Sequence, residues 1–479
     1  MNYTGGVAAD DLPDEMIHRI QSFMDARPAA QTTVLFKSWR LAWLTRPDLD
    51  FRDQDFPYPW IQFQAFARNT LQRYENRNRR INSFRLGMET VVDHHLATEL
   101  IVRAIRLGAT NLTLRIPRTA GHIMYFLPNE VLDSETLAGL SAHDCQIILQ
   151  FGRKEVSWSN LKTLNLSHSF IYGDLFHDLI SKCTSLEKIA LDRNVSFPTL
   201  FRGPRRLSPP CESKLKLHKL KSLQLIGLGR RDYIYRHELW PKFPCLKELE
   251  IRDVDSNNYD WTGLRICSPS LELITIYTYH NKIRNGTFDV PNIRKFKLVG
   301  NYLPQLDEFK TSSSNREWKS DIHVQCYTFT ASWFSSLSEL LIMLSPSRIS
   351  LSVHMDSKYF PRKSVYSGDG GLPTPRVENL SITGFYELCF SWFSAFLEAL
   401  LQSCCPNCIG VDTRLTGNAN LEALFQRLGY RPYETDDLSG DQQYLIRFQR
   451  VWRYGERSLC TTRHGLRELC VVYMPTAKM

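Results

Sequence analysis

The chain has 479 residues, of which 43% are hydrophobic and 23% charged, and this composition provides enough apolar surface for folded domains. Its length predicts one large domain with one or two smaller ones and excludes a single small module. Basic residues exceed acidic residues by nine, an excess too dilute to indicate a nucleic-acid-binding arm by itself.

The chain carries no feature that indicates secretion or membrane insertion. Its twelve cysteines are too few for a disulfide scaffold and are expected to be buried thiols. Residues 1–16 lack a basic start followed by an apolar run, so no secretory signal is expected, and no apolar run predicts a membrane-spanning helix. We therefore expect a reducing compartment, the cytoplasm, the nucleus or both.

The first predicted elements are three short helices between residues 11 and 49. Pro13 precedes two acidic residues that favour a helix start, and apolar residues follow at helical spacing. Pro28 begins a second helix, and a third apolar cluster around Trp39 ends at Pro47. Helices this short cannot bury all of these side chains among themselves, so something else must cover them.

Two motifs in this segment resemble those of a known family. Leu12-Pro13-Asp14-Glu15 stands at its start, and Lys37-Ser38-Trp39-Arg40 with Trp43 stands near its end, at a compatible separation. This arrangement resembles a plant-type F-box, which implies docking onto a Skp-type adaptor and, through it, onto a cullin. The residues that match the motif and are expected to bind the adaptor are Leu12, Pro13, Ile17, Ile20, Val34, Leu35 and Trp39. The alternative is that these positions merely pack on the following domain.

Beyond residue 100, apolar residues recur in Leu-x-x-Leu-x-Leu lines whose starts lie 22 to 34 residues apart. This period is typical of leucine-rich repeats, in which each repeat adds one strand to a solenoid. The longest interval is explained by an inserted loop over 201–219. The lines are Leu137/Leu140/Ala142, Leu161/Leu164/Leu166, Leu186/Ile189/Leu191, Leu220/Leu223/Leu225, Leu246/Leu249/Ile251, Leu271/Ile274/Ile276 and Ile293/Phe296/Leu298, with less regular candidates at Ile349/Leu351, Val377/Leu380/Ile382 and Cys408/Val411.

Helical patterns between several lines, such as 175–180 and 396–401, predict a helix after each strand. Asn301 extends one line at a position where its side chain can bond backbone groups of the adjoining turn. The predicted fold class is α/β, with an N-terminal three-helix F-box followed by a leucine-rich-repeat solenoid that has parallel strands on one face and helices on the other.

The predicted domains are an F-box over 10–50, a linker or helical start of the solenoid over 51–108, repeats with inserted loops over 109–415, and a C-terminal cap or tail over 416–479. The chain up to about residue 300 resembles plant F-box proteins with leucine-rich repeats (F-box/LRR, FBD-like). Some relatives end in a small C-terminal module, which residues 420–479 do not match, so the fold of the tail stays open.

No motif predicts catalysis, a metal or a cofactor, and the chain is not expected to be an enzyme. Cys404, Cys405 and Cys408 have a spacing that metal sites use, but a second pair is lacking, so structural burial is expected. His94 and His95 are expected to be packed or solvated. Two basic clusters, 73–80 and 230–236, could hold nucleic acid, although a solvated surface is the expected role.

The resemblance thus implies a substrate-recognition subunit of an SCF-type (Skp-cullin-F-box) ubiquitin ligase. Its F-box would dock on the adaptor, while the repeats would hold a target protein for ubiquitination, so that proximity favours the transfer. The alternative is a non-ligase protein-interaction scaffold. The sequence predicts neither the target protein nor a requirement for phosphorylation or for a small molecule.

Overall fold

The computed structural model divides the chain into two compact units, Met1–Ile226 (unit 1) and Gly227–Met479 (unit 2). It describes residues 12–24, 26–56, 59–89, 94–118, 123–148, 156–171, 182–192, 217–227, 240–253, 260–312, 318–326, 329–355, 374–384, 390–412, 418–432 and 445–450.

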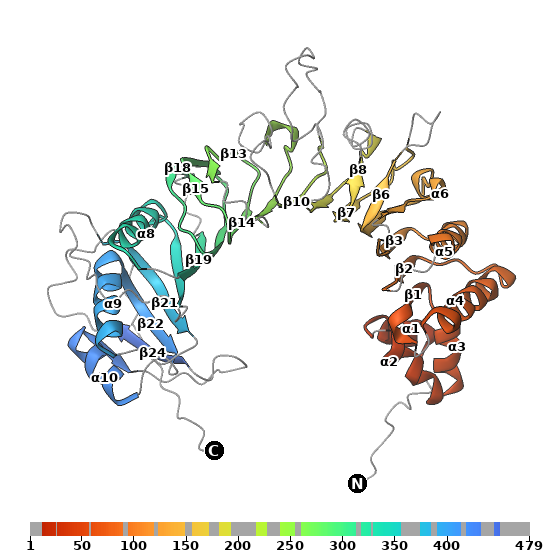
Figure 1. Cartoon of the computed structure of the whole chain (residues 1–479), viewed down its shortest axis with the longest axis horizontal. Helices are drawn as coiled ribbons and strands as arrows, with labels where there is room; N and C mark the ends of the chain where they lie inside the picture. The colour runs from red at the N-terminus through yellow and green to blue at the C-terminus, as the bar shows by residue number, and fades with distance from the viewer. Residues whose placement is uncertain are drawn as a thin grey trace, which may run out of the picture. The chain divides into compact units, whose positions relative to one another are not determined.

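Unit 1 begins with three short helices, here called the head, and continues as a parallel sheet (Figure 1). The head comprises α1 (Asp14–Ser22), α2 (Ala26–Gln31), the 3-10 turn η2 (Thr32–Val34) and α3 (Lys37–Thr45). The strands of the sheet, in spatial order, are β1 (Asp48–Arg52), β2 (Ser83–Gly87), β3 (Asn111–Arg115), β5 (Gly139–His143), β7 (Thr163–Ser167), β9 (Lys188–Leu191) and β10 (Ser222–Ile226).

The register of this sheet stacks one buried apolar residue of each strand on that of the next strand. Leu49 of β1 pairs with Phe84, and the row continues through Leu112, Leu140 and Leu164. A slip by one residue would turn every strand's apolar set toward solvent, so burial fixes the register. The remaining elements of unit 1 are η3 (Asp53–Asp55), α4 (Pro59–Asn76), α5 (His94–Arg106), β4 (Tyr125–Phe126), α6 (Asn129–Leu132), β6 (Cys145–Ile147) and β8 (Phe170–Ile171).

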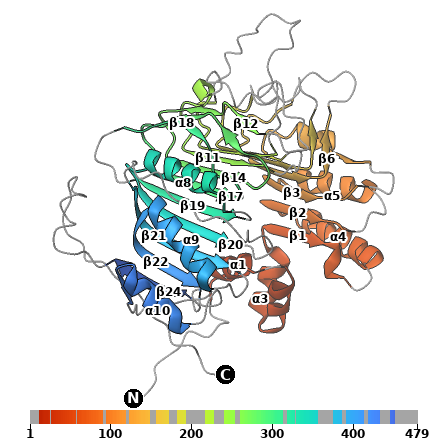
Figure 2. The ribbon, with the colours of Figure 1, turned by 60° about the vertical axis from the view of Figure 1, so that its left-hand side comes forward.

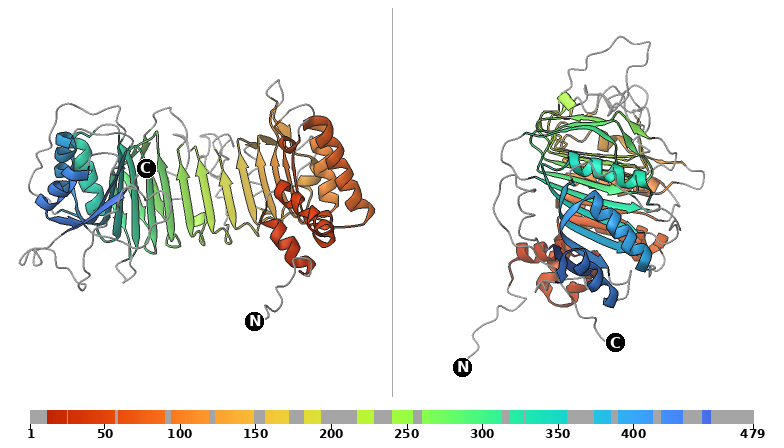
Figure 3. Two further views of the ribbon diagram at one scale, coloured as in Figure 1. Left: turned by 90° about the horizontal axis from the view of Figure 1, so that it is seen from below. Right: turned by 90° about the vertical axis from the view of Figure 1, so that its left-hand side faces the viewer.

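Unit 2 contains a second run of parallel strands that ends in two antiparallel ones, and Figure 3 shows the strands of each unit side by side. The strands, in spatial order, are β11 (Glu248–Arg252), β14 (Leu273–Thr278), β17 (Lys295–Gly300), β19 (Lys319–Cys326), β20 (Arg348–Met355), β21 (Arg376–Gly384), β22 (Cys405–Asp412), β24 (Leu445–Arg450) and β23 (Tyr430–Pro432).

Helices and short strands connect the long strands of unit 2, and Figure 2 shows α8 and α9 lying on one side of the sheet. The connecting elements are η5 (Trp240–Lys242), β12 (Trp261–Thr262), β13 (Arg265–Cys267), β15 (Ile283–Arg284), β16 (Gly286–Asp289), β18 (Leu306–Lys310), α8 (Ala331–Met343), α9 (Phe390–Ser403) and α10 (Asn418–Arg427).

The predicted fold class is confirmed, since N-terminal helices precede long parallel sheets whose strands coincide with the predicted apolar lines. Every residue of the seven regular lines is buried, at 6% exposure or less. The amide of Asn301 donates to the carbonyl of Tyr279 at 2.7 Å, as its place in the repeat signature predicts. The predicted helix over 396–401 lies within α9, whereas the one over 175–180 lies outside the described residues.

The expectation of a helix in every repeat is wrong for part of unit 2. Between β14 and β17, where every residue is described, the structure has β15 and β16, and the described residues between β11 and β14 form β12 and β13. Only 16 residues separate Thr278 from Lys295, which leaves little room for a helix with its two connecting turns. In the line Cys408/Val411 only the first position is wrong, because Val411 is buried as predicted, whereas Ile409 is buried in place of Cys408, which is partly exposed.

Candidate partner-binding surface

The head has a small hydrophobic core of its own. Ile17 of α1 packs with Trp39 and Ala42 of α3, and these three side chains are buried, with Leu12 and Ile20 partly buried against them. Helical spacing explains the arrangement, because Trp39 and Ala42 lie three residues apart and so share one face of α3.

Buried hydrogen bonds brace this core. Gln21 of α1 is buried, and its amide donates to the hydroxyl of Thr32 at 3.0 Å and to the carbonyl of Trp39 at 3.2 Å. His18 lies within hydrogen-bonding distance of the Ala42 carbonyl, at 3.1 Å. These bonds tie the end of α1 to the segment that precedes Val34, so the three short elements form one structural unit.

Large apolar side chains of the head remain in contact with solvent. Val34 is 85% exposed and Phe23 is 78% exposed, and Leu35 follows at 55%. The hydrogen bond from Gln21 to Thr32 holds the end of α1 close to η2. Phe23 lies two residues after Gln21, and Val34 lies two residues after Thr32. Seven large apolar side chains exposed on so small a unit favour an interaction site. The other exposed apolar side chains of the head are Met16, Met24, Phe36 and Leu41.

The sequence-predicted residues divide between the core and the surface of the head. Pro13, Val34 and Leu35 are exposed. Ile17 and Trp39 are enclosed by the chain itself, with 0% and 6% exposure, so neither is available to a partner in this conformation. Their burial follows from their position between α1 and α3, which the apolar pattern alone does not reveal. The remaining two predicted residues, Leu12 and Ile20, are half-buried against this core.

Sequence reasoning missed Phe23, Met24 and Phe36 as exposed candidates because they lie just outside the helices: Phe23 and Met24 follow the end of α1, and Phe36 precedes α3. The apolar residues of α1 span a wide face, of which only one side packs on α3. Ile17 and Gln21, one turn apart, face the core, which leaves Met16 outside at 52% exposure. We call Met16, Phe23, Met24, Val34, Leu35, Phe36 and Leu41 the apolar surface of the head.

A buried joint connects the head to the first strand–helix unit. The hydroxyl of Tyr74 in α4 donates to the carbonyl of Arg46 at 2.7 Å. The backbone N–H of Asn82 donates to the carbonyl of Pro47, also at 2.7 Å. Burial lowers the pKa of Arg46 to about 10, and its guanidinium lies 3.3 Å from the ring centroid of Trp43. These contacts orient the head relative to β1 and α4 within unit 1.

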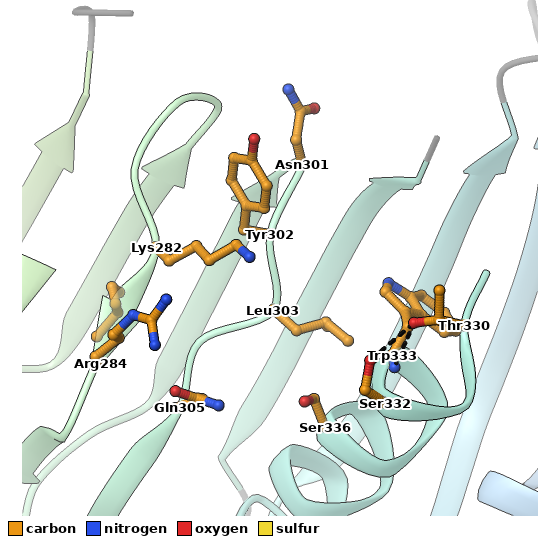
Figure 4. A pocket seen from close by; sticks show the side chains of 11 residues that line it. Lys282, Arg284, Asn301, Tyr302, Leu303, Gln305, Thr330, Ser332, Trp333 and Ser336 are labelled. Carbon is orange, nitrogen blue, oxygen red and sulfur yellow. Dashed lines mark hydrogen bonds between the residues drawn. The ribbon is translucent and has the colours of Figure 1, made fainter. Parts of the chain in front are cut away.

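Unit 2 contains a cavity of about 320 Å³ between the β15 segment and α8 (Figure 4). Lys282 and Arg284 line one side, and Ser332, Trp333 and Ser336 line the other. The lining residues include no carboxylate, imidazole or thiol, and their cationic groups are those of Lys282 and Arg284. The cavity is therefore a polar recess with a cationic side.

The other candidate sites do not gather into a centre within the part of the chain that the structure describes. Cys404 is buried, and burial raises the pKa of its thiol, while Cys405 and Cys408 lie in β22. No group of three or more His, Cys, Asp or Glu residues suited to a metal occurs among the described positions. Arg77, Arg79 and Arg80 are exposed after α4, and cluster 230–236 lies outside the described residues. None of the described helices combines the length and hydropathy needed to cross a membrane.

The fold defines a repeat protein with a helical head, and the comparisons with known proteins identify the class further. Residues 107–207 match a family model described as FBD-associated F-box protein At5g56370, LRR repeats. The matched segment contains β3 to β9, whose buried lines carry the repeat pattern.

Several Arabidopsis thaliana proteins are similar to this chain. A putative F-box/LRR-repeat protein, At5g41840, is 29% identical over 231 residues, which cover 41% of this chain and 42% of that protein. The F-box/FBD/LRR-repeat protein At2g26030 is 28% identical over 194 residues, covering 40% and 42%. A putative F-box/FBD/LRR-repeat protein, At5g44950, is 26% identical over 253 residues, covering 52% and 53%. The chain thus spans about half or less of these relatives, and its resemblance to plant F-box/LRR proteins is confirmed.

Proposed function

We propose that this chain is the substrate-recognition subunit of an SCF-type ubiquitin ligase. Its head would bind a Skp-type adaptor that is linked to a cullin, and its repeats would hold a target protein for ubiquitination. The observation that carries the proposal is the apolar surface of the head, which lies on helices with a separate core. The chain would supply proximity, and the bond-making steps would belong to other subunits.

The burial data refine which residues would contact the adaptor. We assign the contact to Pro13, Val34 and Leu35 together with the exposed Phe23. Ile17 and Trp39 would act indirectly, because they form the core on which the exposed side chains are mounted. Leu12 and Ile20, half-buried, would serve both roles at the edge of that core.

The size of the expected effect follows from the exposed area. Burying a fully exposed valine or leucine side chain contributes about 1.5–3 kcal/mol, so Val34, at 85% exposure, and Leu35, at 55%, would together contribute about 2–4 kcal/mol to adaptor binding. A double substitution by aspartate removes this contribution and adds two charges to the interface. Adaptor affinity should therefore fall by about 100-fold or more.

The test is co-purification of adaptor and cullin with the full-length chain. Val34→Asp combined with Leu35→Asp should abolish it, whereas Ile61→Asp should leave it intact. Ile61 is a matched control, because it is 76% exposed on α4 outside the head. Retention of adaptor by the double variant would refute the proposed contact. Binding of an adaptor without any cullin in the complex would favour the alternative, a non-ligase scaffold.

A further inference from the structure

Three cations occupy successive positions in one row across the sheet of unit 2. The register pairs Lys295 of β17 with Lys319 of β19, and Lys319 with Arg348 of β20. These side chains alternate with buried residues along each strand, so they share the outward face of the sheet. Neighbouring strands are about 4.8 Å apart, which places like charges directly opposite one another.

Elsewhere in the chain, unlike charges lie across neighbouring strands. Asp50 of β1 is opposite Arg85 of β2, with 3.4 Å between their charged atoms. Just before β11 and β14, the ammonium of Lys247 lies 3.0 Å from the carboxylate of Glu272. Like charges directly opposite one another destabilise a sheet, so the row of three cations is an arrangement that stability alone does not favour.

The positive charge extends beyond this row to Lys297, which the register places opposite Asp321 of β19. Lys297 lies two residues further along β17, on the same face. Asp321 is the one acidic residue in the sequences of β17, β19 and β20, and its carboxylate lies 2.6 Å from the ammonium of Lys295. Burial and the charge of Lys297 both lower the pKa of His323, which is consistent with a positive potential here. We call Lys295, Lys297, Lys319 and Arg348 the basic patch.

An aromatic surface borders the basic patch on the side of β14. The guanidinium of Arg252 lies 4.2 Å from the ring centroid of Tyr277, and the rings of Tyr277 and Tyr279 stack with centroids 6.1 Å apart. In the register, Tyr277 is two strands from His323, with Val299 between them.

We propose that the basic patch binds an acidic segment of the target protein. The proposal rests on the proposed function for the identity of the partner as a target. Two observations favour a protein over a nucleic acid. The face of Tyr277 is covered by Arg252 and stacked with Tyr279, so it is not free to stack on bases. Asp321 lies within the patch and would repel a continuous phosphate backbone, whereas a peptide can place a neutral residue there.

The binding test uses the full-length chain and a fluorescent acidic peptide in which glutamates are interrupted by neutral residues, with anisotropy recorded as NaCl is increased. The wild-type chain should bind the peptide with an affinity that decreases with salt. Lys319→Glu combined with Arg348→Glu should weaken binding by about tenfold or more. Lys188→Glu should leave it unchanged, because Lys188 occupies the corresponding position of β9 between the neutral Thr163 and Ser222.

Two outcomes would overturn the proposal. One is equal binding of the peptide by the patch variant and the wild type, and the other is tighter wild-type binding of an oligouridylate of the same length. The melting temperature is a second readout, which separates loss of peptide binding from loss of folding. Lys319→Gln relieves repulsion from Lys295 and Arg348, so it should raise the melting temperature while weakening peptide binding, and a lowered melting temperature would contradict the argument. Adaptor and ubiquitin take no part, so these results are independent of the docking test.

Discussion

Replacing Trp39 by alanine separates a core role from a contact role. The indole is 6% exposed and packs with Ile17 and Ala42, so its loss opens a cavity in a core of very few side chains. Truncating a buried tryptophan costs about 3–5 kcal/mol, and a head this small has few other contacts that could compensate. We expect the head to unfold locally while the repeats stay folded.

Hydrogen exchange measured by mass spectrometry checks this expectation. Peptides from α1 and α3 should lose protection in Trp39→Ala, and peptides from β3 to β7 should keep it. Trp39→Phe retains a large apolar side chain and should show an intermediate effect. The reasoning is refuted if Trp39→Ala leaves the exchange of α1 unchanged while adaptor binding is lost, because that result would make Trp39 a direct contact.

Three further predictions concern other parts of the chain. Tyr74→Phe removes the donor to the Arg46 carbonyl and should lower the free energy of unfolding of unit 1 by about 1–3 kcal/mol, measured by urea denaturation. Asp253→Ala removes a buried carboxylate that accepts three backbone amides at 2.7 to 2.9 Å, and should cost unit 2 about 3 kcal/mol or more, with Asp253→Asn costing less. Burial, aided by His168, lowers the pKa of His143 against the opposing effect of Asp144. The unfolded chain therefore takes up this proton first, so stability should fall as the pH drops below about 6.5, and His143→Gln should reduce that fall in thermal melts.

The repeat region was predictable because its signal is local and repeated. Leu140, Leu164 and Ile189 each stand at the centre of an apolar line, and the register places them side by side in the core. Burial on one face of a strand fixes which residues point inward, so the sequence pattern and the structure agree. The connections between the long strands were less predictable, because the length of each connection decides whether it contains a helix or a short strand.

The head was harder to predict because some of its apolar residues form its core and others lie on its surface. Ile17 and Met16 are adjacent in sequence and similar in hydrophobicity, yet Ile17 is buried and Met16 is 52% exposed. The difference arises from the packing of α1 against α3, which periodicity over nine residues does not determine. The basic patch was also invisible in the sequence, because Lys295, Lys319 and Arg348 meet only through strand pairing.

Site-specific photo-crosslinking tests the central claim most directly. A photoreactive amino acid placed at Val34 in the full-length chain should crosslink to a Skp-type adaptor, and the same amino acid at Ile61 should not. Both positions are highly exposed, so equal reactivity toward solvent is expected of them. Crosslinking of the adaptor from Ile61 but not from Val34 would contradict the account.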